Sequence, residues 1–225
     1  MTHGVIGSVN ALIGGLFLLT SFAMVATRQV RGCLGQFVYQ SILLAASALL
    51  IGGSTASWHL VAVGLITLIT KPILIPWLLR RTVPERIFTR REVALTVNAT
   101  TSLLIALGLA VLSYFIARSL LFAAAADFAA VNLPIGIAGL LLGGYTLTVR
   151  REAVPQLIAI LTMENSAFFA GIAIAPDLSI IAELAVAFDA LVLAFVIGLL
   201  TRLIHERAGH TEVARLAELR EEAKR

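Results

Sequence analysis

The sequence contains a series of apolar runs, each long enough to cross a lipid bilayer as a helix. A span needs about 20 apolar residues, because a helix rises 1.5 Å per residue and the hydrocarbon core is roughly 30 Å thick. Of the 225 residues, 59% are hydrophobic and 13% are charged, against about 25% charged in ordinary soluble domains. We predict an all-α membrane protein whose seven transmembrane helices lie near 5–26, 34–52, 58–79, 93–116, 132–149, 154–175 and 179–204.

The basic residues predict how the chain is oriented. Lys71 lies inside a run and Arg118 is expected in a loop on the opposite side, whereas every other Lys and Arg lies at the end of, or after, the first, third, fifth or seventh run. Cytoplasmic loops carry this kind of excess, so we expect a multi-pass protein of a prokaryotic inner (plasma) membrane, with the N-terminus outside and the C-terminus in the cytoplasm. We place the basic segment 80–92 at the cytoplasmic interface. The charge is spread over several loops, which argues against nucleic-acid binding.

A three-helix unit occurs twice along the chain. Asn10 and Asn132 each lie in the pattern Val-Asn-x-x-Ile-Gly, and the next basic residue follows each of them after 18 positions, at Arg28 and Arg150. Both units would start outside, so this is a parallel repeat, as known from transporters. We therefore divide a single bundle, 1–205, into a first unit 1–92, a linking helix and loop 93–130 and a second unit 131–205, followed by a cytoplasmic helical tail 206–225.

The chain lacks the residues that redox and metal centres need. Cys33 is the single cysteine, so neither a disulfide nor a thiolate-ligated cluster can form within the chain. The four histidines have no metal-ligand spacing, and no nucleotide-binding motif or nucleophile elbow occurs. We expect no catalytic centre, no metal and no cofactor in this chain, so any enzymatic activity would belong to a larger complex.

Four ionisable side chains lie within the predicted spans: Lys71, Glu164, Glu183 and Asp189. A charge at the centre of a membrane helix costs about 2.5–3.5 kcal/mol, so residues of this kind indicate function. Glu164 and Asp189 are equally far from a predicted turn at 176–177, which places them at one depth on adjacent antiparallel helices. Carboxyl groups in low dielectric resist ionisation, and one that holds a proton suits a proton relay. The alternative for both is a buried, hydrogen-bonded acid.

Lys71 occupies the equivalent span of the first unit and is followed by Pro72 and Pro76. Proline breaks the hydrogen bonding of a helix, so a lysine there fits a hydrated cavity or an ion pair with a partner's carboxylate. A purely structural ion pair is the alternative. The preceding span offers Gln40 and other neutral polar residues but no acid. Glu183 lies near the outer surface on a different face from Asp189, which makes it a secondary candidate.

Part of the sequence resembles a known family. Residues 131–206 are similar to the small K subunit of complex I and its relatives in cation/proton antiporters. The similarity lies in a glycine-rich span (IGIAGLLLGGYTL), the pair Arg150-Arg151 and two spans with central acids. In that family two mid-membrane glutamates transfer protons, and the resemblance maps them onto Glu164 and Asp189. Asp189 departs from the usual glutamate by one methylene, which changes its reach.

The whole chain resembles the E component of hydrogenase-4 and related membrane-bound hydrogenases, which also carry an intramembrane lysine followed by proline, here TLITKPILIPWLLRR. The resemblance implies a non-catalytic membrane-arm subunit beside antiporter-like membrane subunits and a peripheral hydrogenase-type redox arm. Proton translocation through Glu164, Asp189 and Lys71 would be its function. The alternatives are a structural scaffold of such a complex, a cation/proton antiporter subunit or a stand-alone proton-coupled transporter.

Overall fold

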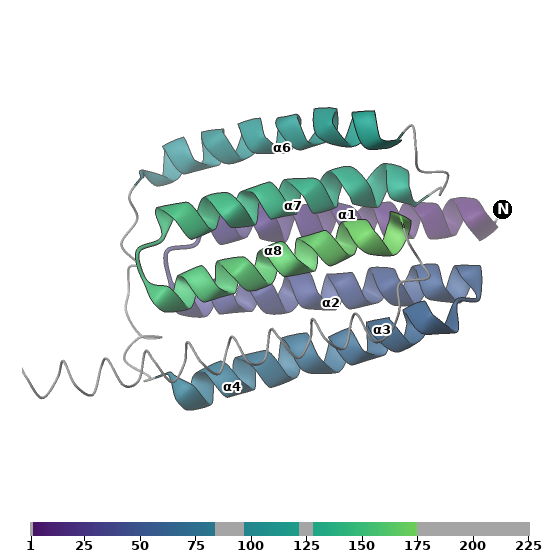
Figure 1. Cartoon of the computed structure of the whole chain (residues 1–225), viewed down its shortest axis with the longest axis horizontal. Helices are drawn as coiled ribbons and strands as arrows, with labels where there is room; N and C mark the ends of the chain where they lie inside the picture. Colours follow the sequence, from purple (N-terminus) through teal and green to yellow (C-terminus); the bar gives the residue numbers. More distant parts are fainter. Residues whose placement is uncertain (1, 84–96, 122–127, 175–225) are drawn as a thin grey trace, which may run out of the picture.

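The computed structural model describes residues 2–83, 97–121 and 128–174, and helices account for nearly all of them (Figure 1). No strand occurs within these ranges. The elements are α1 (Thr2–Ala26), α2 (Val30–Thr55), α3 (Trp58–Ile69), η1 (Thr70–Leu74), α4 (Ile75–Thr82), α6 (Ala99–Leu121), α7 (Ala129–Val149) and α8 (Ala153–Ile174). The element η1 is a single turn of π-helix that joins α3 to α4.

Within these ranges six helical segments are long and apolar enough to span a membrane, which confirms the all-α prediction and fits a multi-pass membrane protein. They are Gly4–Ala26, Val30–Thr55, Trp58–Arg81, Ala99–Leu121, Ala129–Val149 and Ala153–Ile172. The third of them runs continuously through α3, η1 and α4. The predicted seventh span (179–204), the cytoplasmic tail (206–225) and most of the basic segment 80–92 lie outside the described residues.

The fourth span differs from its prediction. It was expected at 93–116, but α6 begins at Ala99 and continues to Leu121. The backbone amide of Ser102 donates to the carbonyl oxygen of Asn98 across 2.9 Å, and asparagine is favoured just before the first turn of a helix. Arg118, expected in a loop, lies in the last turn of α6, where a cation interacts favourably with the helix dipole.

The helices form a bundle in which α6 lies along one edge and α3–α4 lie along the opposite edge (Figure 1). Helix α7 packs most extensively on α8, and α1 packs on α7 while α2 packs on α8. Glycines allow the closest approach. A methyl group added at Gly136 would lie 2.7 Å from the backbone nitrogen of Ala170, so α7 and α8 are in near backbone contact, as small residues permit in membrane bundles.

Among the described residues the bundle interior contains a small apolar cluster of Val25, Ala106 and Leu142 and two larger apolar clusters, with polar side chains between the larger two. One cluster contains Phe37 of α2 together with residues of α4 and α8. The other contains Leu44 of α2 and the stacked rings of Phe17 and Phe169, whose centroids are 4.3 Å apart. Gln40 and Ser41 lie between Phe37 and Leu44 on α2, and both are buried. The polar layer at their level contains the candidate site.

Candidate functional site

Lys71 lies in the π-helical turn and is 4% exposed. Pro72 and Pro76 have no amide hydrogen, so neither can donate to the carbonyl group one turn earlier. The hydroxyl of Thr70 donates to the carbonyl oxygen of Ile66 across 2.8 Å. Single π-helical turns within α-helices frequently occur at functional sites. The two prolines therefore place Lys71 at an irregular point of a membrane-spanning helix.

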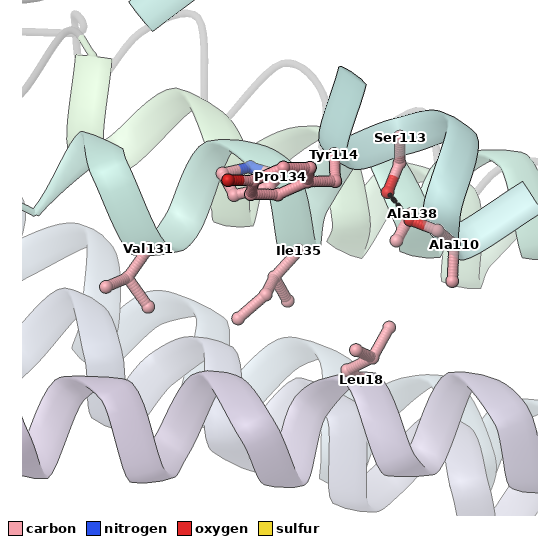
Figure 2. Close-up of a pocket in the computed structure, with 8 residues that line it drawn as sticks. All are labelled: Leu18, Ala110, Ser113, Tyr114, Val131, Pro134, Ile135 and Ala138. Atoms are coloured by element: carbon pink, nitrogen blue, oxygen red, sulfur yellow. Dashed lines mark hydrogen bonds between the residues drawn. The ribbon is translucent and has the colours of Figure 1, made fainter. Parts of the chain in front are cut away.

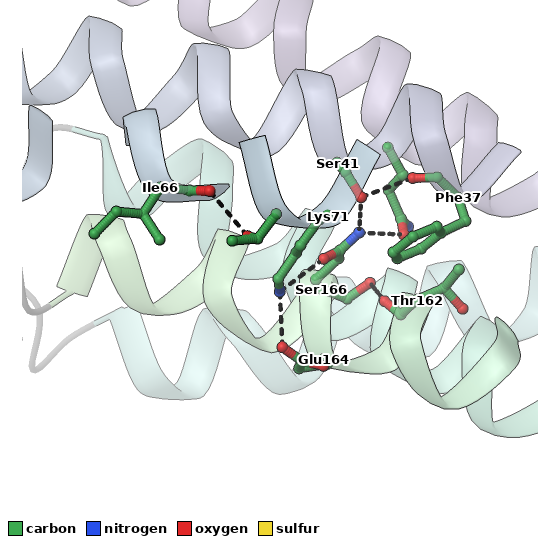
Figure 3. A network of polar contacts seen from close by, with 10 residues as sticks. Phe37, Ser41, Ile66, Lys71, Thr162, Glu164 and Ser166 are labelled. Carbon is green, nitrogen blue, oxygen red and sulfur yellow. Dashed lines mark hydrogen bonds and ion pairs between the residues drawn. The ribbon is translucent and has the colours of Figure 1, made fainter. Parts of the chain in front are cut away.

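The Lys71 ammonium forms an ion pair with Glu164 of α8 (Figure 3). Its Nζ donates to Glu164 Oε1 across 2.8 Å, and the side chains are 5% and 18% exposed. Nζ also lies 4.8 Å from the ring centroid of Phe168, one helical turn after Glu164. A cation over an aromatic ring gains further electrostatic stabilisation when it is removed from water. Two charges from distant parts of the sequence are thus paired inside the bundle.

Asn165 connects this ion pair to α2. Its Oδ1 accepts a hydrogen bond from Lys71 Nζ across 2.9 Å. Its Nδ2 donates to Ser41 Oγ across 2.8 Å and to Gln40 Oε1 across 3.4 Å. Gln40 in turn donates through Nε2 to Ser21 Oγ of α1 across 3.0 Å. The site therefore joins elements of both predicted repeat units through satisfied hydrogen bonds, as buried polar groups require.

The structure brings together two of the side chains predicted from the sequence, Lys71 and Glu164. Asp189 and Glu183 lie outside the described residues, so the expected pairing of Glu164 with Asp189 stays a prediction. Sequence reasoning missed Asn165 as part of the site. The available signal was that Asn165 directly follows an intramembrane acid. Only the rotation of α8 in the structure shows that the Asn165 side chain points to α2.

A second buried polar cluster joins the two asparagines of the repeated pattern. Asn10 Nδ2 donates to Asn132 Oδ1 across 2.7 Å, and Asn132 Nδ2 donates to Ser47 Oγ across 3.2 Å. Ser47 Oγ donates to Asn10 Oδ1 across 2.8 Å, which closes the triangle. All three residues are 0% exposed. The cluster is neutral and satisfies itself, so it joins α1, α2 and α7 without offering a charge.

Arg150 is buried where α7 ends and holds the end of α1. Its Nη2 donates to the carbonyl oxygen of Met24 across 3.0 Å and to that of Thr27. Burial lowers the pKa of Arg150, while the proximity of Cys33 and Glu152 acts in the opposite direction. The guanidinium group nevertheless stays charged at ordinary pH. Cations stabilise the carbonyl ends of helices, so we interpret Arg150 as a structural clamp.

The described helices also form an apolar pocket of about 290 Å³ between α1, α6 and α7 (Figure 2). Leu18, Tyr114 and Ile135 are among its lining residues. The hydroxyl of Ser113 at its wall donates to the carbonyl oxygen of Ala110 across 2.7 Å, so this polar group is already satisfied. No charged side chain of the described residues lines the pocket.

Within the described ranges no three His, Cys, Asp or Glu side chains are close enough to bind a metal ion together. The chemistry that the site offers is instead that of a carboxylate and an ammonium in a low-dielectric environment. A carboxylate there can gain a proton when its partner moves away, and it can lose the proton when the partner returns.

A curated protein aligns with nearly the whole chain. The uncharacterized protein Rv0085 of Mycobacterium tuberculosis is 30% identical over 222 residues, which cover 95% of this chain and 96% of the relative. The chain belongs to the Rv0085 family. No family model matches the sequence, and no solved structure matches it.

Proposed function

We propose that this chain is a non-catalytic membrane-arm subunit of a membrane-bound hydrogenase or complex I-like oxidoreductase, and that it takes part in proton translocation. In this proposal it spans the plasma membrane seven times, with its N-terminus outside and its C-terminus in the cytoplasm. The observation that carries the proposal is the partly buried ion pair between Lys71 and Glu164 at a break in a membrane-spanning helix.

The depth of the pair supports this role. Lys71 is 13 residues from the start of its candidate span and 10 from the end, and Glu164 is 11 and 8 residues from the ends of its own. At 1.5 Å per residue, both are about 12–20 Å from either end of their helix, close to the middle of the hydrocarbon core. Charges at this depth are costly and are characteristic of proton and ion pathways.

In the proposed cycle the Glu164 carboxylate accepts a proton from a neighbouring donor and becomes neutral, which weakens its attraction to Lys71. Release of that proton restores the carboxylate and the ion pair. Lys71 supplies the positive charge that stabilises the ionised state. Asp189 is proposed as a further acid of the pathway and Glu183 as a secondary one. Antiporter-like membrane subunits and a peripheral redox arm would be the partners that drive the cycle.

The first experiment is Glu164→Gln in membranes that contain the assembled complex. Glutamine keeps the shape of the side chain but carries no exchangeable acid, so we expect proton pumping into vesicles to fall at least tenfold while the complex assembles. Glu152→Gln, the same change near the start of α8, serves as the matched control and should pump normally. Normal pumping by an assembled Glu164→Gln variant would overturn the proposal.

A structural scaffold is the second candidate, because the pair also joins the α3–α4 segment to α8 through direct contacts. The exchanged pair Lys71→Glu with Glu164→Lys separates the two candidates. It retains opposite charges, so a scaffold should assemble and support pumping. A relay should assemble but pump poorly, because the acid has moved to another helix.

An antiporter subunit or a stand-alone transporter would have different partners. Purification in a mild detergent, followed by mass spectrometry, should recover antiporter-like subunits and a cysteine-rich redox subunit if the main proposal holds. Antiporter-like subunits without a redox subunit would indicate an antiporter. A chain that is purified without other subunits and takes up protons only with a substrate would indicate a transporter.

A further inference from the structure

The hydrogen bonds that connect the Lys71 ammonium through Asn165 to α2 and α1 run in one direction. The ammonium donates to Asn165 Oδ1 across 2.9 Å, which leaves the amide nitrogen of Asn165 to face α2. That nitrogen donates to Ser41 Oγ and to Gln40 Oε1. A flipped amide would instead place its NH₂ group against the ammonium. Contact with a cation therefore determines how Asn165 is oriented.

The two acceptors on α2 are held in the matching direction. Ser41 Oγ donates to the carbonyl oxygen of Phe37 across 2.8 Å, so it presents lone pairs to Asn165. Gln40 donates to Ser21 Oγ, and Ser21 donates to the carbonyl oxygen of Phe17 across 3.1 Å. Each donor in this network points away from Lys71 and each acceptor points towards it. Aligned dipoles of this kind stabilise a positive charge at Lys71.

The same network offers no route for the proton. Side-chain amides donate and accept hydrogen bonds but do not titrate at ordinary pH. Asn165 and Gln40 therefore interrupt any chain of exchangeable protons from Lys71 to α1 and α2. The ammonium also contacts the Glu164 carboxylate, whose side chain is 18% exposed against 5% for Lys71.

We propose that Asn165 is the positioning residue of this site, which holds Lys71 as a fixed positive charge while proton exchange takes place at Glu164. The physiological purpose of this arrangement rests on the proposed function. When Glu164 Oε1 takes up a proton, the ammonium keeps Asn165 Oδ1 and the ring face of Phe168 as partners. Lys71 can then stay protonated, and the carboxyl group alone changes its charge.

The electrostatic surroundings in the described part of the chain are otherwise neutral. From α2 the groups that face the site are Gln40 and Ser41, and from α8 they are Asn165 and Phe168. Helix α7 contains no ionisable acid or base that could face α8 at this level except Tyr145, which donates to Ser102 of α6. The nearest basic residues along the α3–α4 segment, Arg80 and Arg81, lie more than two helical turns beyond Lys71.

The test is an infrared titration of the full chain in lipid nanodiscs. Subtraction of the Glu164→Gln spectrum isolates the carboxyl band of Glu164. Asn165→Leu removes one hydrogen-bond acceptor of the Lys71 ammonium. The ionised carboxylate of Glu164 then provides a larger share of the stabilisation of that charge. We expect half-protonation of Glu164 at a pH about one unit lower than in the unsubstituted protein, since a hydrogen bond to a charged group is worth about that much.

Two further variants give the titration its controls. Asn165→Asp adds a carboxylate beside Glu164 and should move half-protonation to higher pH, opposite to Asn165→Leu. Asn132→Leu removes an equally buried asparagine from the other polar cluster and should leave the half-protonation pH of Glu164 unchanged. Two results would overturn the role of Asn165. One is that Asn165→Leu shifts the half-protonation pH of Glu164 no more than Asn132→Leu does. The other is that Asn165→Leu and Asn165→Asp shift it in the same direction.

Ser41→Ala supplies a second measurement if Asn165→Leu does not fold. It keeps Asn165 but removes an acceptor that orients the amide, so the shift should have the same sign and be smaller. No shift in a folded Ser41→Ala variant would count against the proposal. Infrared spectra report protonation and not transport, so normal pumping by Glu164→Gln would overturn the proposed function alone, whereas a missing shift would overturn the role of Asn165 alone.

Discussion

Asn10 of α1 and Asn132 of α7 lie 122 positions apart and share a hydrogen bond of 2.7 Å inside the bundle. They are also the matched asparagines of the two Val-Asn-x-x-Ile-Gly patterns. The equivalent positions of the predicted repeat units therefore meet each other, with Ser47 completing the triangle. A buried polar contact of this kind specifies how α1 and α7 align, since any shift along the helix axes leaves amide groups unpaired.

The first prediction concerns this contact. Asn132→Leu leaves Asn10 and Ser47 with unpaired groups in an apolar interior, so we expect a loss of about 1–3 kcal/mol in the free energy of unfolding. Asn10→Leu should cost a similar amount. The double variant should lose clearly less than the sum of the two, because no unpaired amide remains. The free energy of unfolding of the three variants can be measured in mixed micelles with an increasing fraction of denaturing detergent. Strictly additive losses would show that the two asparagines act independently.

The second prediction concerns Arg150 and its neighbour in sequence. Arg150→Ala removes a buried guanidinium that donates to two carbonyl oxygens near the end of α1. We expect it to cost about 2–4 kcal/mol, because hydrogen bonds from a charged donor and a large packed side chain are lost together. Arg151→Ala is the matched control, and because Arg151 is exposed it should change stability by less than about 0.5 kcal/mol. Equal effects of the two substitutions, in the same denaturation assay, would contradict the clamp.

Much of the fold follows from the sequence, because membrane helices are dictated by local composition. Apolar runs between basic loops predicted the described spans to within a few residues, except for α6, whose start depends on the turn at Asn98. Lys71 was recognised because a charge in an apolar run is costly wherever its partner lies.

The partners within the site could not be predicted in the same way. Lys71 contacts Glu164 at a separation of 93 positions and Asn165 at 94, so the contacts depend on how α3–α4 and α8 rotate against each other. No local pattern records that rotation. Asn165 was missed for this reason, because an asparagine between Glu164 and Ser166 has no periodicity that distinguishes a site residue from a packing residue.

The third prediction uses two glycines in different surroundings. Gly136→Ala would place a methyl group 2.7 Å from the backbone of α8, at Ala170 N and Ser166 O, and backbone atoms cannot move aside cheaply. We expect separation of α7 from α8 and a loss of about 1–3 kcal/mol. Gly15→Ala meets nothing within 4 Å and should cause no loss, since alanine also favours the helix. The comparison uses the same denaturation assay, and an equally tolerated Gly136→Ala would mean that α7 and α8 are not in near backbone contact.

The last prediction concerns the energy of the ion pair itself. Lys71→Met leaves the Glu164 carboxylate without its cation in a low-dielectric interior, and removal of one partner from a buried pair typically costs about 3–5 kcal/mol. Protonation of Glu164 should recover part of this loss, so the variant should become relatively more stable as the pH falls.

The double variant Lys71→Met with Glu164→Gln has no charge left to bury and should be more stable than Lys71→Met at neutral pH. Its stability should also depend less on pH. If both variants unfold at the same detergent fraction at every pH, the pair contributes no specific electrostatic energy, and the mid-membrane charges would have to be explained by contacts other than the one between Lys71 and Glu164.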